Sequence, residues 1–143
     1  MRYSYDNKSP ERNYHKKIRD GFKRFHSMNA QTRIMTFDDT QDANITILQF
    51  VSYDTPIIQA TINHKHSSVT VVCNDNPFGW SCSTSRQVAR WLYESRYLSF
   101  DASTLRMAYE NCHGVTPDVS VYEYHNITFE FRSSYSFNRI WRF

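Results

Sequence analysis

The sequence predicts an α+β fold: an antiparallel sheet of four to six strands, an N-terminal helix, and two helices inserted before the last strand or hairpin. Two patterns support this prediction. Segments rich in β-branched and aromatic residues alternate with short polar turns over residues 44–73, as in an antiparallel meander. Between residues 80 and 112, two segments combine a helix-capping residue with apolar residues at helical spacing.

Length and composition favour one domain. The chain has 143 residues, is 40% hydrophobic, and contains enough apolar area for a core. Only three glycines and four prolines are present, which excludes flexible-linker and low-complexity proteins. We expect a flexible N-terminus at residues 1–9 and a single α+β domain at residues 10–143.

The N-terminal helix is expected over residues 10–26, because Ser9-Pro10-Glu11 has the order of a cap, a first-turn proline and a first-turn acid. Its apolar stripe consists of Tyr14, Ile18, Phe22 and Phe25. Its opposite face is basic and consists of Arg12, Lys16, Arg19 and Lys23. Such a face can bind nucleic acid, a membrane or an acidic groove, or can simply be solvated.

The first half of the chain predicts four strands. They are a short strand around Arg33–Phe37, followed by Asn44–Tyr53, Ile57–Asn63 and Ser68–Cys73. Asp54-Thr55-Pro56 is the expected turn between the second and third. The acids after the first strand, Asp38, Asp39 and Asp42, lack the spacing of a calcium loop, so we interpret them as a solvated loop.

The stretch from Trp80 to Tyr97 is the centre of the functional prediction. Thr84 and Gln87 have the spacing of a capping box, so a helix is expected to begin there. The residues predicted to pack inward are Val88, Trp91, Leu92 and Ser95. Those predicted to face outward and to bind a partner are Arg86, Arg90, Tyr93 and Tyr97. The alternative is a solvated face in which Arg90 pairs locally with Glu94.

The last third predicts a second helix and further β structure. Ser99 or Asp101 caps a helix through about Cys112, with Gly114 as its C-terminal stop. Residues 119–132 form either one long strand or a hairpin at His125-Asn126. The tail, residues 132–143, interleaves aromatic residues with arginines and forms either a closing strand or a partner-binding arm. Its candidate binding residues are Arg139, Trp141 and Arg142.

Charge is segregated along the chain. Residues 1–33 carry nine Lys/Arg against three Asp/Glu, residues 34–131 carry five against eleven, and residues 132–143 carry three against none. Basic ends can bind an acidic partner such as nucleic acid or an acidic protein surface. They can also fold back on the acidic middle of the same chain or of a second copy.

No motif predicts a metal, a cofactor or catalysis. His64-Lys65-His66 and Cys112-His113 lack the paired spacing of a zinc site. Ser83-Thr84-Ser85 lacks the glycines of a phosphate-binding loop, and no nucleophile elbow is present. We therefore expect no enzyme activity, no metal and no cofactor.

Three cysteines and the absence of a secretory signal or an 18-residue apolar run predict a cytoplasmic protein with buried thiols and no membrane partner.

Two segments carry a resemblance to a known group of proteins. Residues 50–57 (FVSYDTPI) and 83–92 (STSRQVARWL) resemble small uncharacterised proteins of bacteriophages and prophages in Gram-positive bacteria. The resemblance covers roughly residues 45–97 and leaves out the basic helix and the tail. It supplies no catalytic residues. It implies phage origin and an accessory role, in a class where small proteins that block host defence, including anti-CRISPR proteins, are common.

The leading hypothesis is therefore a non-catalytic phage accessory protein that acts in the cytoplasm of the infected cell and inhibits a host defence nucleoprotein by binding its surface. Direct DNA or RNA binding is the alternative, and strong salt dependence would distinguish it. A homo-oligomeric structural or assembly protein is the third possibility.

Overall fold

The computed structural model describes residues 24–29, 32–39, 41–95 and 97–142. The flexible segment predicted at residues 1–9 and most of the predicted N-terminal helix lie outside these residues, as do its basic residues Arg12, Lys16, Arg19 and Lys23. Where that helix was expected to end, the structure has a strand, β1 (Arg24–Asn29), so the helical prediction is wrong for Arg24–His26. Pairing with the next strand satisfies the backbone there, with Arg24 opposite Thr36.

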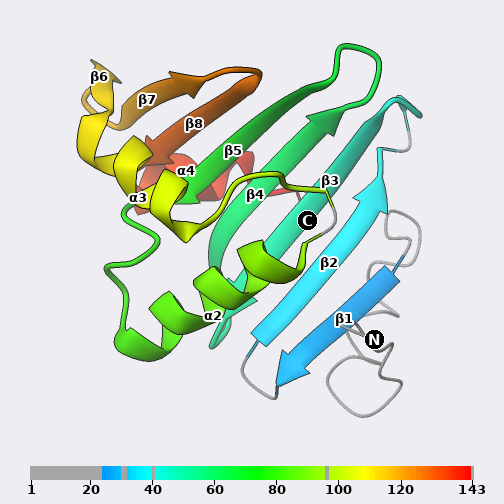
Figure 1. Ribbon diagram of the computed structural model, residues 1–143, viewed down its shortest axis with the longest axis horizontal. Helices are drawn as coiled ribbons and strands as arrows, with labels where there is room; N and C mark the ends of the chain where they lie inside the picture. Colours follow the sequence, from blue (N-terminus) through cyan, green and yellow to red (C-terminus); the bar gives the residue numbers. More distant parts are fainter. Residues whose placement is uncertain (1–23, 30–31, 40, 96, 143) are drawn as a thin grey trace.

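The described residues form one mixed sheet of eight strands, in the order β1-β2-β3-β4-β5-β8-β7-β6 (Figure 1). The other strands are β2 (Thr32–Asp38), β3 (Ile45–Ser52), β4 (Thr55–Asn63), β5 (Ser68–Asn74), β6 (His113–Thr116), β7 (Val119–Tyr124) and β8 (Ile127–Arg132). All neighbours are antiparallel except β5 and β8, which run parallel. The α+β class is confirmed, but the expected four to six strands are too few and the sheet is not wholly antiparallel.

The four strands predicted in the first half are confirmed as β2 to β5. The hairpin between β3 and β4 turns at Tyr53 and Asp54, not at 54–56. Both residues have positive φ angles, 50° and 66°, as a tight two-residue hairpin requires. Pro56 instead lies in β4 beside a register shift between Phe50 and Val51, an irregularity that accommodates a residue without an N–H.

Helix α2 (Cys82–Glu94) begins earlier than the capping-box spacing predicted. Its N-cap is Ser81, whose Oγ accepts a hydrogen bond from the Thr84 N–H at 3.0 Å. The side chains of Thr84 and Gln87 contact β3 instead: Ser52 Oγ lies 3.0 Å from Thr84 Oγ1 and donates to Gln87 Oε1 at 2.5 Å. The proposed capping box therefore fastens the helix to the sheet.

Helix α3 (Ala102–Asn111) has Asp101 as its N-cap, with Asp101 Oδ1 accepting from the Thr104 N–H at 3.0 Å. This decides between the two candidate caps. The helix ends at Cys112, and Gly114 lies in β6 with no positive φ, so Gly114 is not its stop. Residues 119–132 form a hairpin, with His125 at φ 55° in the turn.

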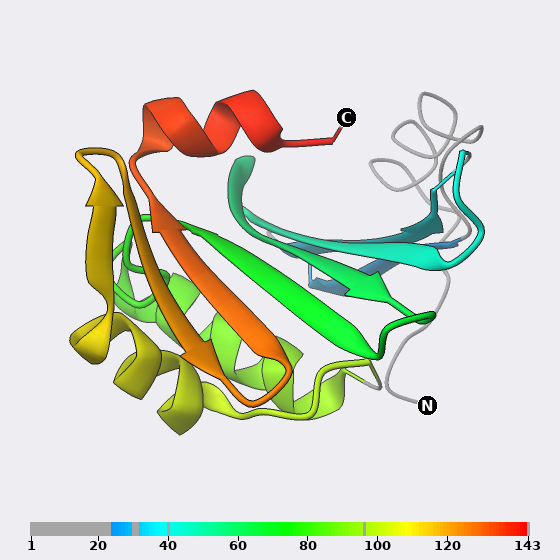
Figure 2. The ribbon, with the colours of Figure 1, turned by 90° about the horizontal axis from the view of Figure 1, so that it is seen from above.

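The C-terminal tail forms a helix, α4 (Ser134–Ile140), so the prediction of a closing strand is wrong. Ser133 caps it by accepting a hydrogen bond from the Ser136 N–H at 3.2 Å. Figure 2 shows α4 on one face of the sheet and both α2 and α3 on the other. The described elements therefore form three layers.

The main core lies between the sheet and the α2–α3 layer. Phe50 of β3 packs on Trp91 of α2 with ring centroids 5.0 Å apart, and Phe100 meets Phe129 of β8 edge-on, also at 5.0 Å. All four side chains are buried. Burying a side chain of this size contributes about 1.5–3 kcal/mol, so these contacts hold α2 and α3 to the sheet.

A buried glutamine pair holds the tail on the opposite face. Gln49 of β3 donates through Nε2 to Gln59 Oε1 of β4 at 2.7 Å and to the Arg142 carbonyl at 2.9 Å. Gln59 donates to the Ile140 carbonyl at 3.0 Å and accepts from the Arg142 N–H at 2.9 Å. We call this set the glutamine clasp. It satisfies backbone groups at the end of α4 that the helix itself leaves unpaired.

Candidate partner-binding surface

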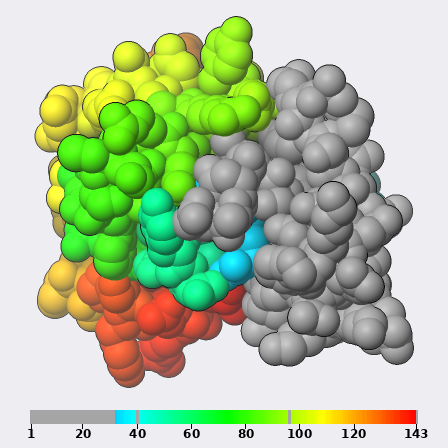
Figure 3. Space-filling model, turned by 90° about the horizontal axis from the view of Figure 1, so that it is seen from below, coloured from blue at the N-terminus to red at the C-terminus, as the bar shows by residue number. Residues whose placement is uncertain are grey.

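The outward face of α2 carries three of the four residues predicted to bind a partner there. Arg86, Arg90 and Tyr93 follow one another at helical spacing and are all exposed, with 88% of Tyr93 accessible. Tyr97 lies beyond the helix, which ends at Glu94, and is 41% exposed. We call Arg86, Arg90 and Tyr93 the α2 face. In Figure 3, α2 appears in green beside the teal turn between β3 and β4.

The burial of the inner residues explains this orientation. Val88, Trp91 and Leu92 pack against the sheet and are buried, as their spacing predicts. Ser95 is the C-cap instead of a packing residue. Because the three buried side chains fix the rotation of the helix about its axis, the arginines must project away from the sheet.

The two arginines differ in their surroundings. Arg90 Nε lies 3.5 Å from Glu94 Oε2 one turn along the helix, and its side chain is 61% exposed. A helix pair between residues i and i+4 contributes only about 0.3–0.5 kcal/mol, so a partner's carboxylate can compete for Arg90. Arg86 has no ion pair with any residue that the structure describes. Its guanidinium is therefore available for a bidentate contact.

The tail does not extend the α2 face. Arg139 is exposed and lies over the Tyr135 ring at 5.7 Å, while Trp141 is half-buried against Phe137 at 5.6 Å. Arg139 lies in α4 and Trp141 comes directly after it, and α4 is on the opposite side of the sheet from α2 (Figure 2). The tail residues and the α2 face therefore lie on different faces of the sheet.

Arg142 is also engaged within the protein. Its guanidinium pairs with Asp39 at 3.1 Å, and its backbone is held in the glutamine clasp. The Gln41 N–H, with a smaller contribution from Arg142, holds the pKa of Asp39 below its usual value. These contacts show that the tail is a docked segment and not a free arm.

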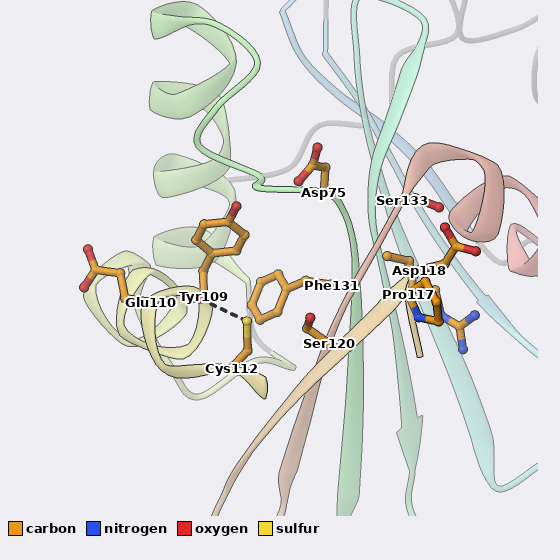
Figure 4. A pocket seen from close by; sticks show the side chains of 10 residues that line it. Asp75, Tyr109, Glu110, Cys112, Pro117, Asp118, Ser120, Phe131 and Ser133 are labelled. Atoms are coloured by element: carbon orange, nitrogen blue, oxygen red, sulfur yellow. Dashed lines mark hydrogen bonds between the residues drawn. The ribbon is translucent and has the colours of Figure 1, made fainter. Parts of the chain in front are cut away.

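A cavity of about 480 Å³ lies elsewhere, at the carboxyl ends of β5 and β8 (Figure 4). It is lined by Asp75, Tyr109, Glu110, Cys112, Pro117, Asp118, Ser120, Phe131, Arg132 and Ser133. The topology accounts for its position. The chain leaves β5 toward α2 on one face and leaves β8 toward α4 on the other, and such divergence of neighbouring parallel strands opens a crevice where ligands commonly bind.

Two aromatic rings form one wall of this cavity. Tyr109 and Phe131 meet edge to face with centroids 5.2 Å apart, and Cys112 donates its thiol to the Tyr109 carbonyl at 3.0 Å. Burial, followed by the nearby carboxylate of Asp75, raises the pKa of the Tyr109 phenol. In Figure 4 the Tyr109 hydroxyl points toward Asp75. The sequence offered one signal for this site, the polar loop at residues 74–79.

The three cysteines have different surroundings. Cys73 is buried, Cys112 is half-buried and Cys82 is exposed at the start of α2. The prediction of buried thiols is therefore wrong for Cys82, because the first residue of a capped helix projects outward here.

Within the described ranges, no three His, Cys, Asp or Glu side chains are grouped as a metal site would require. His64, from the His64-Lys65-His66 segment, shares a hydrogen bond of 2.7 Å with Thr46 Oγ1 through its Nε2. No helix among these residues has the length and apolar content needed to cross a bilayer.

Comparison of the chain with protein-family models, with curated proteins and with solved structures finds no match.

Proposed function

We propose that this protein is a non-catalytic binding protein whose α2 face recognises an acidic macromolecular surface. The observation that carries the proposal is the exposure of Arg86, Arg90 and Tyr93 on a helix whose opposite side is anchored in the core. Arginine supplies bidentate contacts to carboxylates or phosphates, and tyrosine adds contact area at low entropic cost. A rigid helix presents these groups with little further ordering on binding.

The resemblance of residues 50–57 and 83–92 to phage proteins favours one class of partner. We place the target among host defence nucleoproteins, which the protein would inhibit by covering their surface in the cytoplasm of the infected cell. Both resembling segments meet in the structure, since Ser52 contacts Thr84 and Gln87 at the base of α2. The shared pattern thus supports the position of the α2 face.

The test compares Arg86→Glu with Lys65→Glu, a matched change of two charge units in an exposed turn at the opposite end of the sheet. Purified guide-RNA-loaded defence effector complexes are immobilised, and binding is measured by biolayer interferometry. We expect Arg86→Glu to weaken binding about tenfold or more, because a lost charged contact leaves its partner unpaired, and Lys65→Glu to change it less than twofold. A glutamate near the start of a helix interacts favourably with the helix dipole, so we expect the Arg86→Glu protein to fold.

Two outcomes contradict the proposal. Equal binding by wild type and Arg86→Glu would remove the α2 face from the contact. Binding of naked duplex or single-stranded DNA as tightly as the effector, with steep loss at raised salt, would show direct nucleic-acid recognition instead.

A further inference from the structure

The cavity between α3, β7 and the carboxyl ends of β5 and β8 has the size of a small-ligand site and is partly open to solvent. Its volume of about 480 Å³ lies within the range of about 300–1,000 Å³ typical of ligand pockets. Its walls come from the loop after β5, the end of α3, the turn before β7 and the end of β8. The cavity is therefore lined by elements on both sides of the parallel pair, and no single loop forms it.

The backbone around the cavity is fixed by hydrogen bonds. The Asp75 N–H donates to the Arg132 carbonyl at 2.7 Å, which extends the parallel pairing by one residue. The Ser133 N–H donates to the Asp118 carbonyl at 3.0 Å and joins the turn before β7 to the start of α4. The opening is therefore preformed, which lowers the ordering cost of binding a ligand.

The charged residues at the cavity determine the sign of the charge that its ligand carries. Asp75, Glu110 and Asp118 are exposed at its rim, and none of them forms an ion pair with a described residue. The one cation in the lining, Arg132, is already neutralised by Glu130 at 2.9 Å and donates to Ser136 at 2.8 Å. The cavity thus keeps an excess of negative charge, which raises the local concentration of cations at its opening.

The aromatic wall decides the shape of the ligand. The half-buried Tyr109 ring packs edge to face on the buried Phe131 and offers an apolar surface, and the face of an aromatic ring attracts a cation within about 6 Å. A ligand with a short apolar stem can lie along the Tyr109 ring while its charged end reaches Asp75 or Asp118. We propose that this cavity binds organic cations of that kind: an alkylammonium or alkylguanidinium group. The inference is independent of the α2 face.

The test titrates the protein with n-butylguanidinium and n-butylammonium chloride and follows the aromatic signals of Tyr109 and Phe131 by NMR. Butyrate and n-butanol have the same stem with a negative or no charge and serve as matched controls. We expect saturable shifts with the two cations, in the millimolar range, and none with butyrate or butanol. Added salt should weaken binding of the cations, because the carboxylates are at an exposed rim.

Variants locate the binding site. Asp75→Asn keeps the side-chain oxygen that accepts the Asn76 N–H at 2.9 Å, and asparagine tolerates the positive φ of 57° at this position. Asp118→Asn alters a side chain with no hydrogen bond to a described residue. Each should weaken cation binding about fivefold, while Glu123→Gln, an equal charge change at the far end of β7, should leave it within twofold.

Three results would overturn the inference: unsaturated shifts up to about 50 mM cation, equal shifts with butyrate, or unchanged affinity in both aspartate variants. Because Asp118→Asn removes no contact within the fold, loss of folding in Asp75→Asn alone would still leave a decisive measurement.

Discussion

At the scale of single residues, Cys73 has the most altered chemistry. It is fully buried in β5, in the core between the sheet and the helices. Burial raises the pKa of its thiol well above the usual value, because a thiolate would lose its hydration there. Cys82, in contrast, is exposed at the start of α2. The two thiols therefore differ in their access to solvent.

The raised pKa of Cys73 predicts that the protein loses stability at alkaline pH. Above about pH 8.5, the ordinary pKa of a thiol, the unfolded chain releases the Cys73 proton while the native protein keeps it. The unfolded state then binds fewer protons, so the free energy of unfolding falls as pH rises, by up to about 1.4 kcal/mol per pH unit. Urea unfolding between pH 8 and 10 measures the slope. Cys73→Val should flatten it, and parallel slopes in both proteins would contradict the prediction.

At the scale of elements, α4 depends on contacts outside itself. A helix of seven residues is too short to be stable alone. Its support comes from the Ser133 cap, from the fully buried Phe137 and from the glutamine clasp. Gln49 Oε1 has no hydrogen-bond partner among the described residues, so Gln49 contributes to the clasp through its Nε2 donor alone. The helix is thus a consequence of docking.

Removing the clasp tests this dependence. Gln59→Met keeps the side-chain volume but leaves the Ile140 carbonyl and the Arg142 N–H without their partners. We expect the free energy of unfolding to fall by about 2–3 kcal/mol, since each buried group left unpaired costs about 1–3 kcal/mol. Asn138→Ala, at an exposed position of α4, is the control and should change it by less than about 0.5 kcal/mol. Similar urea midpoints for the two variants would show that the clasp contributes little.

The elements that could be predicted from the sequence are those whose signal is local. Alternation and turn residues identified β2 to β5, and the spacing of Val88, Trp91 and Leu92 identified the buried side of α2. β1 and α4 were missed because tertiary contacts override their local pattern: pairing with β2 in one case and docking on Gln59 in the other.

The binding residues follow the same division. The exposure of Arg86 and Arg90 follows from helical periodicity, so it could be predicted. The cavity could not, because Asp75 meets Arg132 only through the parallel pairing of β5 with β8, which has no local signature.

At the scale of the whole molecule, the sheet consists of two parts joined at one seam. β1 to β5 pair in sequence order, as do β6 to β8, and each part is antiparallel. The seam is the parallel pairing of β5 and β8, with Val71 opposite Phe129, and both side chains are fully buried. At the outer edge, all four residues of β6 are exposed.

This arrangement predicts a gradient of hydrogen exchange. The amides of Val71 and Phe129 should be among the slowest and should exchange only by global unfolding, because they lie in the most buried part of the sheet. The amides of β6 should exchange by local fraying. Native-state exchange followed by NMR measures both. The contrary result is faster exchange, at low denaturant, of the amides that pair β5 with β8 than of those that pair β5 with β4. The sheet would then open at its seam, and the two parts would be separate cooperative units.

The pairing of β5 with β8 also creates a risk of aggregation during synthesis. A ribosome delivers β1 to β5 well before β8, so the first part can fold while the partner of Val69–Asn74 is still missing. In that interval an apolar strand presents unpaired N–H and carbonyl groups to any neighbouring nascent chain. Aggregation of this protein is therefore expected to begin at β5, between the first parts of two unfinished copies, and slower initiation of translation should raise the yield of folded protein.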